Sequence, residues 1–125
     1  MMTMNDSFFA DTYALVEITK GSTSYEKYAL KNLVTTKYNL AELYYSMLRE
    51  FNEETAAAYF SFLWKITIHT SRTSIKEGMK LKLQYKKEKL SYVDCIGYSL
   101  AQELKIPFLT GDSKFKDKEN VAWVK

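Results

Sequence analysis

The stretch SYVDCIGYSLAQELKIPFLTGD (residues 91–112) places an amphipathic helix directly before a short apolar strand. In its first half, apolar or small residues recur at helical spacing: Val93, Ile96, Gly97, Leu100, Ala101 and Leu104. The run IPFLT, residues 106–110, then predicts a strand. A helix followed by a buried strand is the repeating unit of an α/β protein with a parallel sheet.

The same alternation extends over the rest of the chain. Further strands are expected at residues 7–10, 33–36, 66–68 and 121–124, and further helices at about 12–20, 24–31, 40–51, 56–64 and 74–89. Right-handed crossovers between parallel strands put helices on both faces of the sheet, which predicts a three-layer α/β/α sandwich with a mostly parallel sheet. Four glycines and one proline leave no linker, so residues 1–125 are expected to form one domain.

Composition sets few limits on function. Apolar residues make up 46% of the chain and charged residues 26%, as in soluble globular proteins, and a net charge of +3 identifies no partner. No apolar run is long enough to span a membrane, and the start MMTMND has no basic segment followed by an apolar core. The single cysteine, Cys95, is expected to be a packing residue. These features favour a cytoplasmic protein.

Four acidic residues stand where an α/β fold would bring them together. Asp11 and Asp112 each follow a predicted strand, whereas Glu42 and Asp94 lie in the first turn of predicted helices. Strand carboxyl ends and helix amino ends meet at one edge of a parallel sheet, where ligands bind. Any one of the four could merely cap a helix or turn. Together, four carboxylates repel one another unless a cation lies between them, and oxygen ligands favour Mg²⁺ or Mn²⁺. The pattern therefore predicts a metal-dependent phosphoryl-transfer site.

The segments that carry these acids resemble the PIN domain family, in particular the VapC-type ribonucleases of prokaryotic toxin–antitoxin pairs. The matching segments are FFADT at residues 8–12, NLAEL at 39–43, SYVDC at 91–95 and LTGDSKF at 109–115. The resemblance implies an endoribonuclease that uses Mg²⁺ or Mn²⁺, with a catalytic and metal-binding quartet of Asp11, Glu42, Asp94 and Asp112. It also implies that Thr110 orients Asp112 or a bound water, that RNA is the substrate and that a small antitoxin protein is the partner. A homodimer is compatible with it.

Two other functions fit the same residues. One is a PIN-like RNA- or protein-binding module with weak or no catalysis, and the other is a housekeeping RNA-processing nuclease. The intact quartet argues against the first, because a binding module does not need four mutually repelling carboxylates.

A lysine-rich segment covers residues 72–89 and offers candidate contacts to the RNA backbone at Lys80, Lys86 and Lys87. A solvated helix face explains these lysines equally well. The acids of the charged tail after Phe115, Asp117 and Glu119, are not expected to bind metal.

Overall fold

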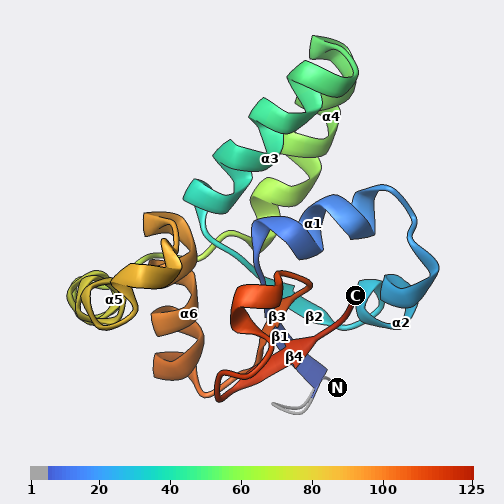
Figure 1. Cartoon of the computed structure of the whole chain (residues 1–125). Helices are drawn as coiled ribbons and strands as arrows, with labels where there is room; N and C mark the ends of the chain where they lie inside the picture. The colour runs from blue at the N-terminus through green and yellow to red at the C-terminus, as the bar shows by residue number, and fades with distance from the viewer. Residues whose placement is uncertain (1–5) are drawn as a thin grey trace.

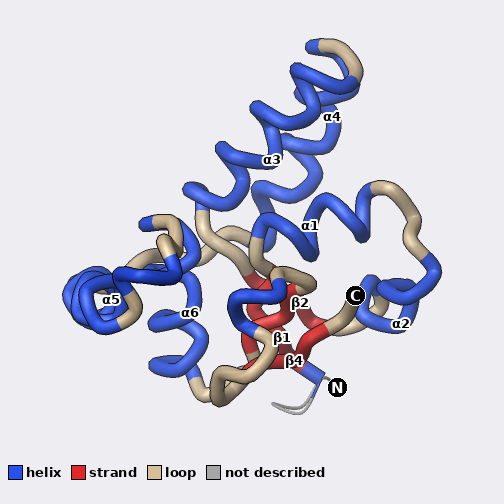
Figure 2. Tube along the Cα trace, in the orientation of Figure 1, coloured by secondary structure: helices blue, strands red, loops and turns tan. Residues whose placement is uncertain are grey.

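The sheet is parallel throughout in the computed structural model, which describes residues 6–125. Most of the start MMTMND, from which the absence of a secretory signal was judged, lies outside the described residues. The strands are β1 (Ser7–Ala10), β2 (Asn32–Val34), β3 (Phe108–Thr110) and β4 (Val121–Trp123). Their order is β2-β1-β3-β4, so β1 and β3 lie at the centre (Figures 1 and 2).

Helices cover both faces of this sheet, as Figure 1 shows. One layer contains α1 (Thr12–Thr19), α2 (Glu26–Ala29), α3 (Lys37–Glu50) and α4 (Glu53–Leu63); the other contains α5 (Arg72–Gln84) and α6 (Tyr92–Leu104). Short 3₁₀ turns cover Thr23–Tyr25 (η2), Trp64–Ile66 (η3), Lys86–Glu88 (η4) and Ser113–Phe115 (η5). The expected three-layer α/β/α sandwich is confirmed.

The alternation of side chains along the central strands builds two cores. Phe9 and Phe108 stack with ring centroids 5.7 Å apart and pack in the cluster on the α6 side. Their neighbours Ala10 and Leu109 belong to the cluster on the α1–α3 side. Because successive strand residues point to opposite faces, a short run buried on both faces is apolar along its middle, with Ser7 and Thr110 only at the strand ends.

The strand expected at residues 66–68 was wrong. The backbone there turns, because the N–H of Thr67 donates to the carbonyl of Trp64, and Thr67 forms only an isolated bridge with Thr35. That bridge supplies two hydrogen bonds at the edge of the sheet and does not extend into a strand. The expected helix at 74–89 also ends early, at Gln84, and continues as η4.

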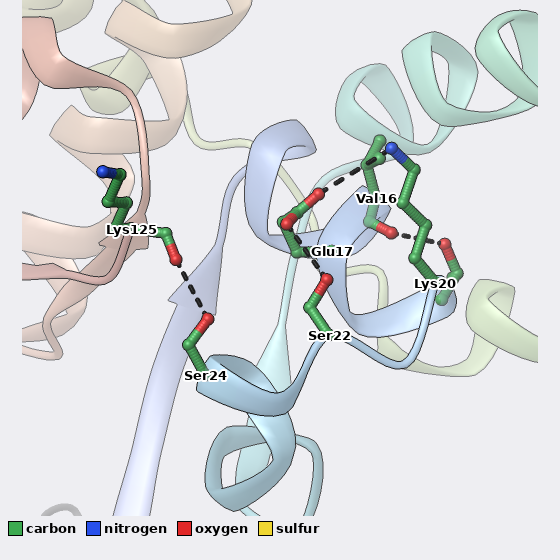
Figure 3. A network of polar contacts seen from close by, with 7 residues as sticks. Val16, Glu17, Lys20, Ser22, Ser24 and Lys125 are labelled. Atoms are coloured by element: carbon green, nitrogen blue, oxygen red, sulfur yellow. Dashed lines mark hydrogen bonds and ion pairs between the residues drawn. The ribbon is translucent and has the colours of Figure 1, made fainter.

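The C-terminus is fastened beside the segment that follows α1 (Figure 3). The hydroxyl of Ser24 donates to the carbonyl of Lys125 at 2.9 Å, and the buried Tyr25 hydroxyl donates to that of Val124 at 2.6 Å. Glu17 holds the same turn by accepting from the Ser22 hydroxyl at 3.0 Å. These contacts hold the chain after the edge strand β4 against η2.

From residue 6 to residue 125, the structure contains no helix long and apolar enough to cross a membrane.

Candidate metal centre

Asp11 directly follows β1 and begins α1. Its backbone is extended, and its Oδ1 accepts a hydrogen bond of 2.8 Å from the N–H of Ala14. Capping a helix in this way satisfies a backbone donor that has no partner within the helix. The side chain is nearly inaccessible, at 1% exposure. Asp11 is therefore a helix cap and also a buried carboxylate at the carboxyl edge of the sheet.

Asp94 lies in the first turn of α6, as its spacing from Ser91 predicts. The Ser91 hydroxyl accepts a hydrogen bond of 3.0 Å from the Asp94 N–H, so Ser91, not Asp94, is the cap. The Asp94 carboxylate also hydrogen-bonds the Ser91 side chain, and the charges of Glu42 and Asp112 act on it.

Glu42 is placed differently from the expectation, because α3 begins three residues earlier. Its cap is Thr36, whose hydroxyl accepts from the N–H of Asn39, so Glu42 lies beyond the first turn. Thr36 is followed by residues compatible with a helix, and the sequence therefore allows the earlier start. Asn39, the residue just before the expected helix at 40–51, therefore lies inside α3 and does not cap it.

Asn39 instead belongs to a chain of hydrogen bonds that ends on Glu42. The Thr36 hydroxyl donates to Oδ1 of Asn39 at 2.6 Å, and Nδ2 of Asn39 donates to the Thr12 hydroxyl at 3.1 Å. Thr12 then donates to Oε1 of Glu42 at 2.5 Å. An amide nitrogen can only donate, so the Thr12 hydroxyl oxygen must accept from it and its own proton must point to Glu42. Within residues 6–125, the second oxygen of Glu42, Oε2, has no hydrogen-bond partner.

Asp112 is held by the turn after β3. Its N–H donates to the Thr110 hydroxyl oxygen at 3.0 Å, and its own Oδ1 accepts from the N–H of Lys114 at 3.0 Å. The Thr110 side chain also hydrogen-bonds the Asp11 carboxylate. Thr110 therefore connects two of the four acids.

Gly111 allows this turn to pass under α1. A Cβ at this position would lie 2.2 Å from the Tyr13 ring and 2.5 Å from the carbonyl oxygen of Val124. Both distances are far below van der Waals contact, so any side chain here would push the turn that carries Asp112 out of place.

The four acids are close enough for their charges to interact. The pKa of Asp11 is raised from 3.8 to about 7, chiefly by burial and to a smaller extent by the negative charges of Asp94 and Asp112, against the hydrogen bonds from Thr110 and Ala14. Burial likewise raises the pKa of Asp94 to about 6, with Glu42 and Asp112 adding to the rise. Desolvation and like charges both disfavour ionised carboxylates. The structure thus brings all four acids to one edge of the sheet.

The four acids do not form a compact cluster of ligands. Among residues 6–125, no three His, Cys, Asp or Glu side chains lie close enough together to form a ready-made metal site. The donor set nevertheless suits a hard divalent cation, because it consists of carboxylate oxygens, and two of these carboxylates resist ionisation without a compensating positive charge.

Three residues near the site were missed by the sequence reasoning. Thr12 and Asn39 position Glu42, and the Lys114 charge lowers the pKa of Asp94. All three lie within the acidic segments quoted above. Their closeness in sequence to Asp11, Glu42 and Asp112 could have identified them as candidate site residues. The lysines singled out from sequence are exposed on α5 and η4, namely Lys80, Lys86 and Lys87.

A match to a known family covers most of the chain. The family model described as "PIN domain" matches residues 8–121. No curated protein matches the sequence.

Several solved structures share the fold at low sequence identity. VapC20 of Mycobacterium tuberculosis, described as a sarcin-ricin loop cleaving toxin, superposes with a TM-score of 0.77 at 15% identity, covering 94% of this chain and 99% of that one. DNA-bound VapBC of Salmonella typhimurium gives 0.73 at 14% identity, with 98% and 97% covered. A toxin–antitoxin complex from Klebsiella pneumoniae gives 0.71 at 19% identity, with 91% and 94% covered.

Proposed function

Since the chain belongs to the PIN domain family, we propose that it is a metal-dependent endoribonuclease and the toxin of a toxin–antitoxin pair. The observation that carries the proposal is the edge of the sheet where four carboxylates meet and where Asp11 and Asp94 have raised pKa values. Such perturbed groups gathered at the carboxyl ends of parallel strands are typical of a catalytic site.

Asp11 and Asp94 would be the principal ligands of Mg²⁺ or Mn²⁺, with Glu42 and Asp112 completing the site directly or through water. A bound divalent cation would lower the pKa of a water molecule to give a nucleophile and would neutralise charge on the phosphate oxygens.

The protein's own contribution is orientation. Thr110 fixes Asp11, and Thr12 fixes one oxygen of Glu42 while leaving the other free for the site. Lys114 adds a positive charge beside Asp94, where it would attract the RNA phosphate.

The antitoxin part of the proposal is supported by the α3–α4 hairpin, which projects from the rest of the molecule in Figure 1. Five large apolar or aromatic side chains on or beside it are at least 40% exposed: Tyr45, Leu48, Phe51, Phe62 and Trp64. An apolar surface of this kind usually marks a protein contact. The structural neighbours described as toxin–antitoxin complexes suggest an antitoxin as the partner.

The test uses purified protein freed of any co-expressed partner. We expect cleavage of single-stranded RNA with Mg²⁺ or Mn²⁺ and none with EDTA. Glu42→Gln should abolish cleavage, whereas Glu50→Gln, an exposed residue at the other end of the same helix, should cleave as the wild type does. Cleavage that persists in EDTA, or in Glu42→Gln, would disprove the metal mechanism or the site.

A second measurement does not depend on activity. Millimolar Mn²⁺ should raise the melting temperature of the wild type, because a ligand that binds only the folded state stabilises it by RT ln(1 + [L]/Kd). The shift should shrink or vanish in Asp94→Asn. Equal shifts in the two proteins would show that Asp94 is not a ligand.

A further inference from the structure

A groove runs beside α6. Its cavity volume is about 780 Å³, within the range of small-molecule binding sites. Tyr98 and Gln102 line it from α6, and they follow Asp94 at intervals of four residues, so the three share one face of the helix. Ser113 and Lys114 line it directly after Asp112. The groove is therefore linked to the acidic edge through Lys114, which lines it and whose charge also lowers the pKa of Asp94.

The groove has two walls, one on each side of α6. The end of α5 and η4 supply Gln84, Tyr85 and Glu88, and the segment after β3 supplies the other wall, including Asp117. Figure 1 shows α6 between α5 and this C-terminal segment.

The groove is a preformed structure. Lys118 Nζ, whose side chain is only 10% exposed, joins the two walls by an ion pair of 2.7 Å with Glu88 and a hydrogen bond of 2.8 Å to the Lys114 carbonyl. It also lies 4.2 Å from the centre of the Tyr85 ring. At the base, the buried Tyr98 hydroxyl donates to the carbonyl of Glu119.

The charge of the lining disfavours a phosphate. Two lysines, Lys114 and Lys118, face three acids, Glu88, Asp117 and Glu119, and Lys118 is already paired. By contrast, the side-chain amides of Gln84 and Gln102 form no hydrogen bond within the described part of the chain. A carboxamide offers a donor and an acceptor together, which is the pattern that the edge of a nucleobase matches.

We propose that this groove binds the base of a nucleotide next to the scissile phosphate of the RNA substrate. The inference rests on the proposed ribonuclease function, and it adds to that function a subsite on this chain. With the phosphate at the acidic edge, the neighbouring nucleotide can enter the groove beside Asp94, and its unstacked base can meet the two amides. Single-stranded RNA is generally read through such unstacked bases.

The test compares short RNAs cut at one mapped bond. An abasic nucleotide replaces the natural one on either side of that bond in turn. For wild type, removal of the base on one side should lower kcat/KM about tenfold, in the range measured for single base contacts. The double variant Gln84→Ala/Gln102→Ala should cut the intact and abasic RNAs at similar rates, whereas Glu54→Ala, on the distant α4, should discriminate as the wild type does.

Binding provides an independent readout. In the inactive Asp94→Asn background, fluorescence anisotropy should show weaker binding of the abasic RNA, and the two glutamine substitutions should remove that difference. If wild type cuts RNA but neither flanking base matters, or if the double variant still discriminates, the subsite is refuted while the nuclease stands. If wild type cuts no RNA with either metal, the proposed function fails, and the subsite with it.

Discussion

Replacing Asp11 with asparagine should stabilise the metal-free protein at pH 8 while abolishing RNA cleavage. The pKa of Asp11 rises from 3.8 to about 7, mainly through burial. At about 1.36 kcal/mol per pKa unit, keeping this carboxylate ionised in the folded state costs up to about 4 kcal/mol. The folded state binds the proton more tightly than the unfolded chain, so the cost is absent below pH 4, grows as the pH rises and is complete above about pH 7.

Asparagine removes the charge and keeps the local structure. Its Oδ1 can still accept from the Ala14 N–H that Asp11 caps, and asparagine caps helices about as well as aspartate. Asp11→Ala is the matched control, because it removes the charge and also the cap, which is worth about 1 kcal/mol. The alanine variant should therefore be less stable than the asparagine variant at every pH.

The assay is urea unfolding in EDTA at pH 5 and pH 8. Wild type should lose stability between the two values, and Asp11→Asn should lose much less. Asp94, with its pKa raised to about 6, adds a dependence of the same sign in both proteins. The reasoning is refuted if Asp11→Asn unfolds at lower urea than wild type at pH 8 and both depend on pH equally.

Three further outcomes are expected. Thr12→Val should lower RNA cleavage about tenfold by freeing Glu42, on the scale of a lost hydrogen bond to a charged group, and Thr12→Ser should restore it; equal rates for both variants would remove Thr12 from the site. Gly111→Ala should lower the melting temperature by forcing Cβ against the Val124 carbonyl, and an unchanged melting curve would contradict the packing. Changing the exposed lysines Lys80, Lys86 and Lys87 to glutamine should weaken RNA binding. It should also flatten the salt dependence of binding, by about 0.7 in the log–log slope for each lost contact on single strands. An unchanged slope would assign these lysines to a solvated face.

The sequence predicted most of the fold because its strongest signals are apolar and local. The runs at residues 7–10 and 106–110 are buried on both faces of the sheet, so no polar residue interrupts them. The run at 66–68, Ile-Thr-Ile, is β-branched throughout, yet it lies beyond the edge strand β2, where only Thr35 pairs with it. Pairing of that kind depends on the tertiary structure and leaves no mark in the local pattern.

The site shows the same division. The closeness of the four acids, whose role as a site stays a prediction, could be inferred because strand and helix ends converge in any parallel sheet. The start of α3 at Thr36 could not, since Thr36 and Asn39 are both good caps and their choice depends on the contact that Asn39 makes with Thr12. The charge of Lys114 beside Asp94 likewise arises only when β3 and α6 are side by side.

The pairing of β1 with β3 also governs when the protein can become active during its synthesis. Phe9 lies opposite Phe108, about 100 residues later in the chain, and no other described strand separates β1 from β3. Contacts this distant in sequence form late, because the intervening chain must first be made and ordered. A growing polypeptide therefore carries Asp11 long before Asp94 and Asp112 exist to join it. A chain that stops before residue 112 lacks Asp112, and only a chain that extends past it can bring all four acids to this edge of the sheet.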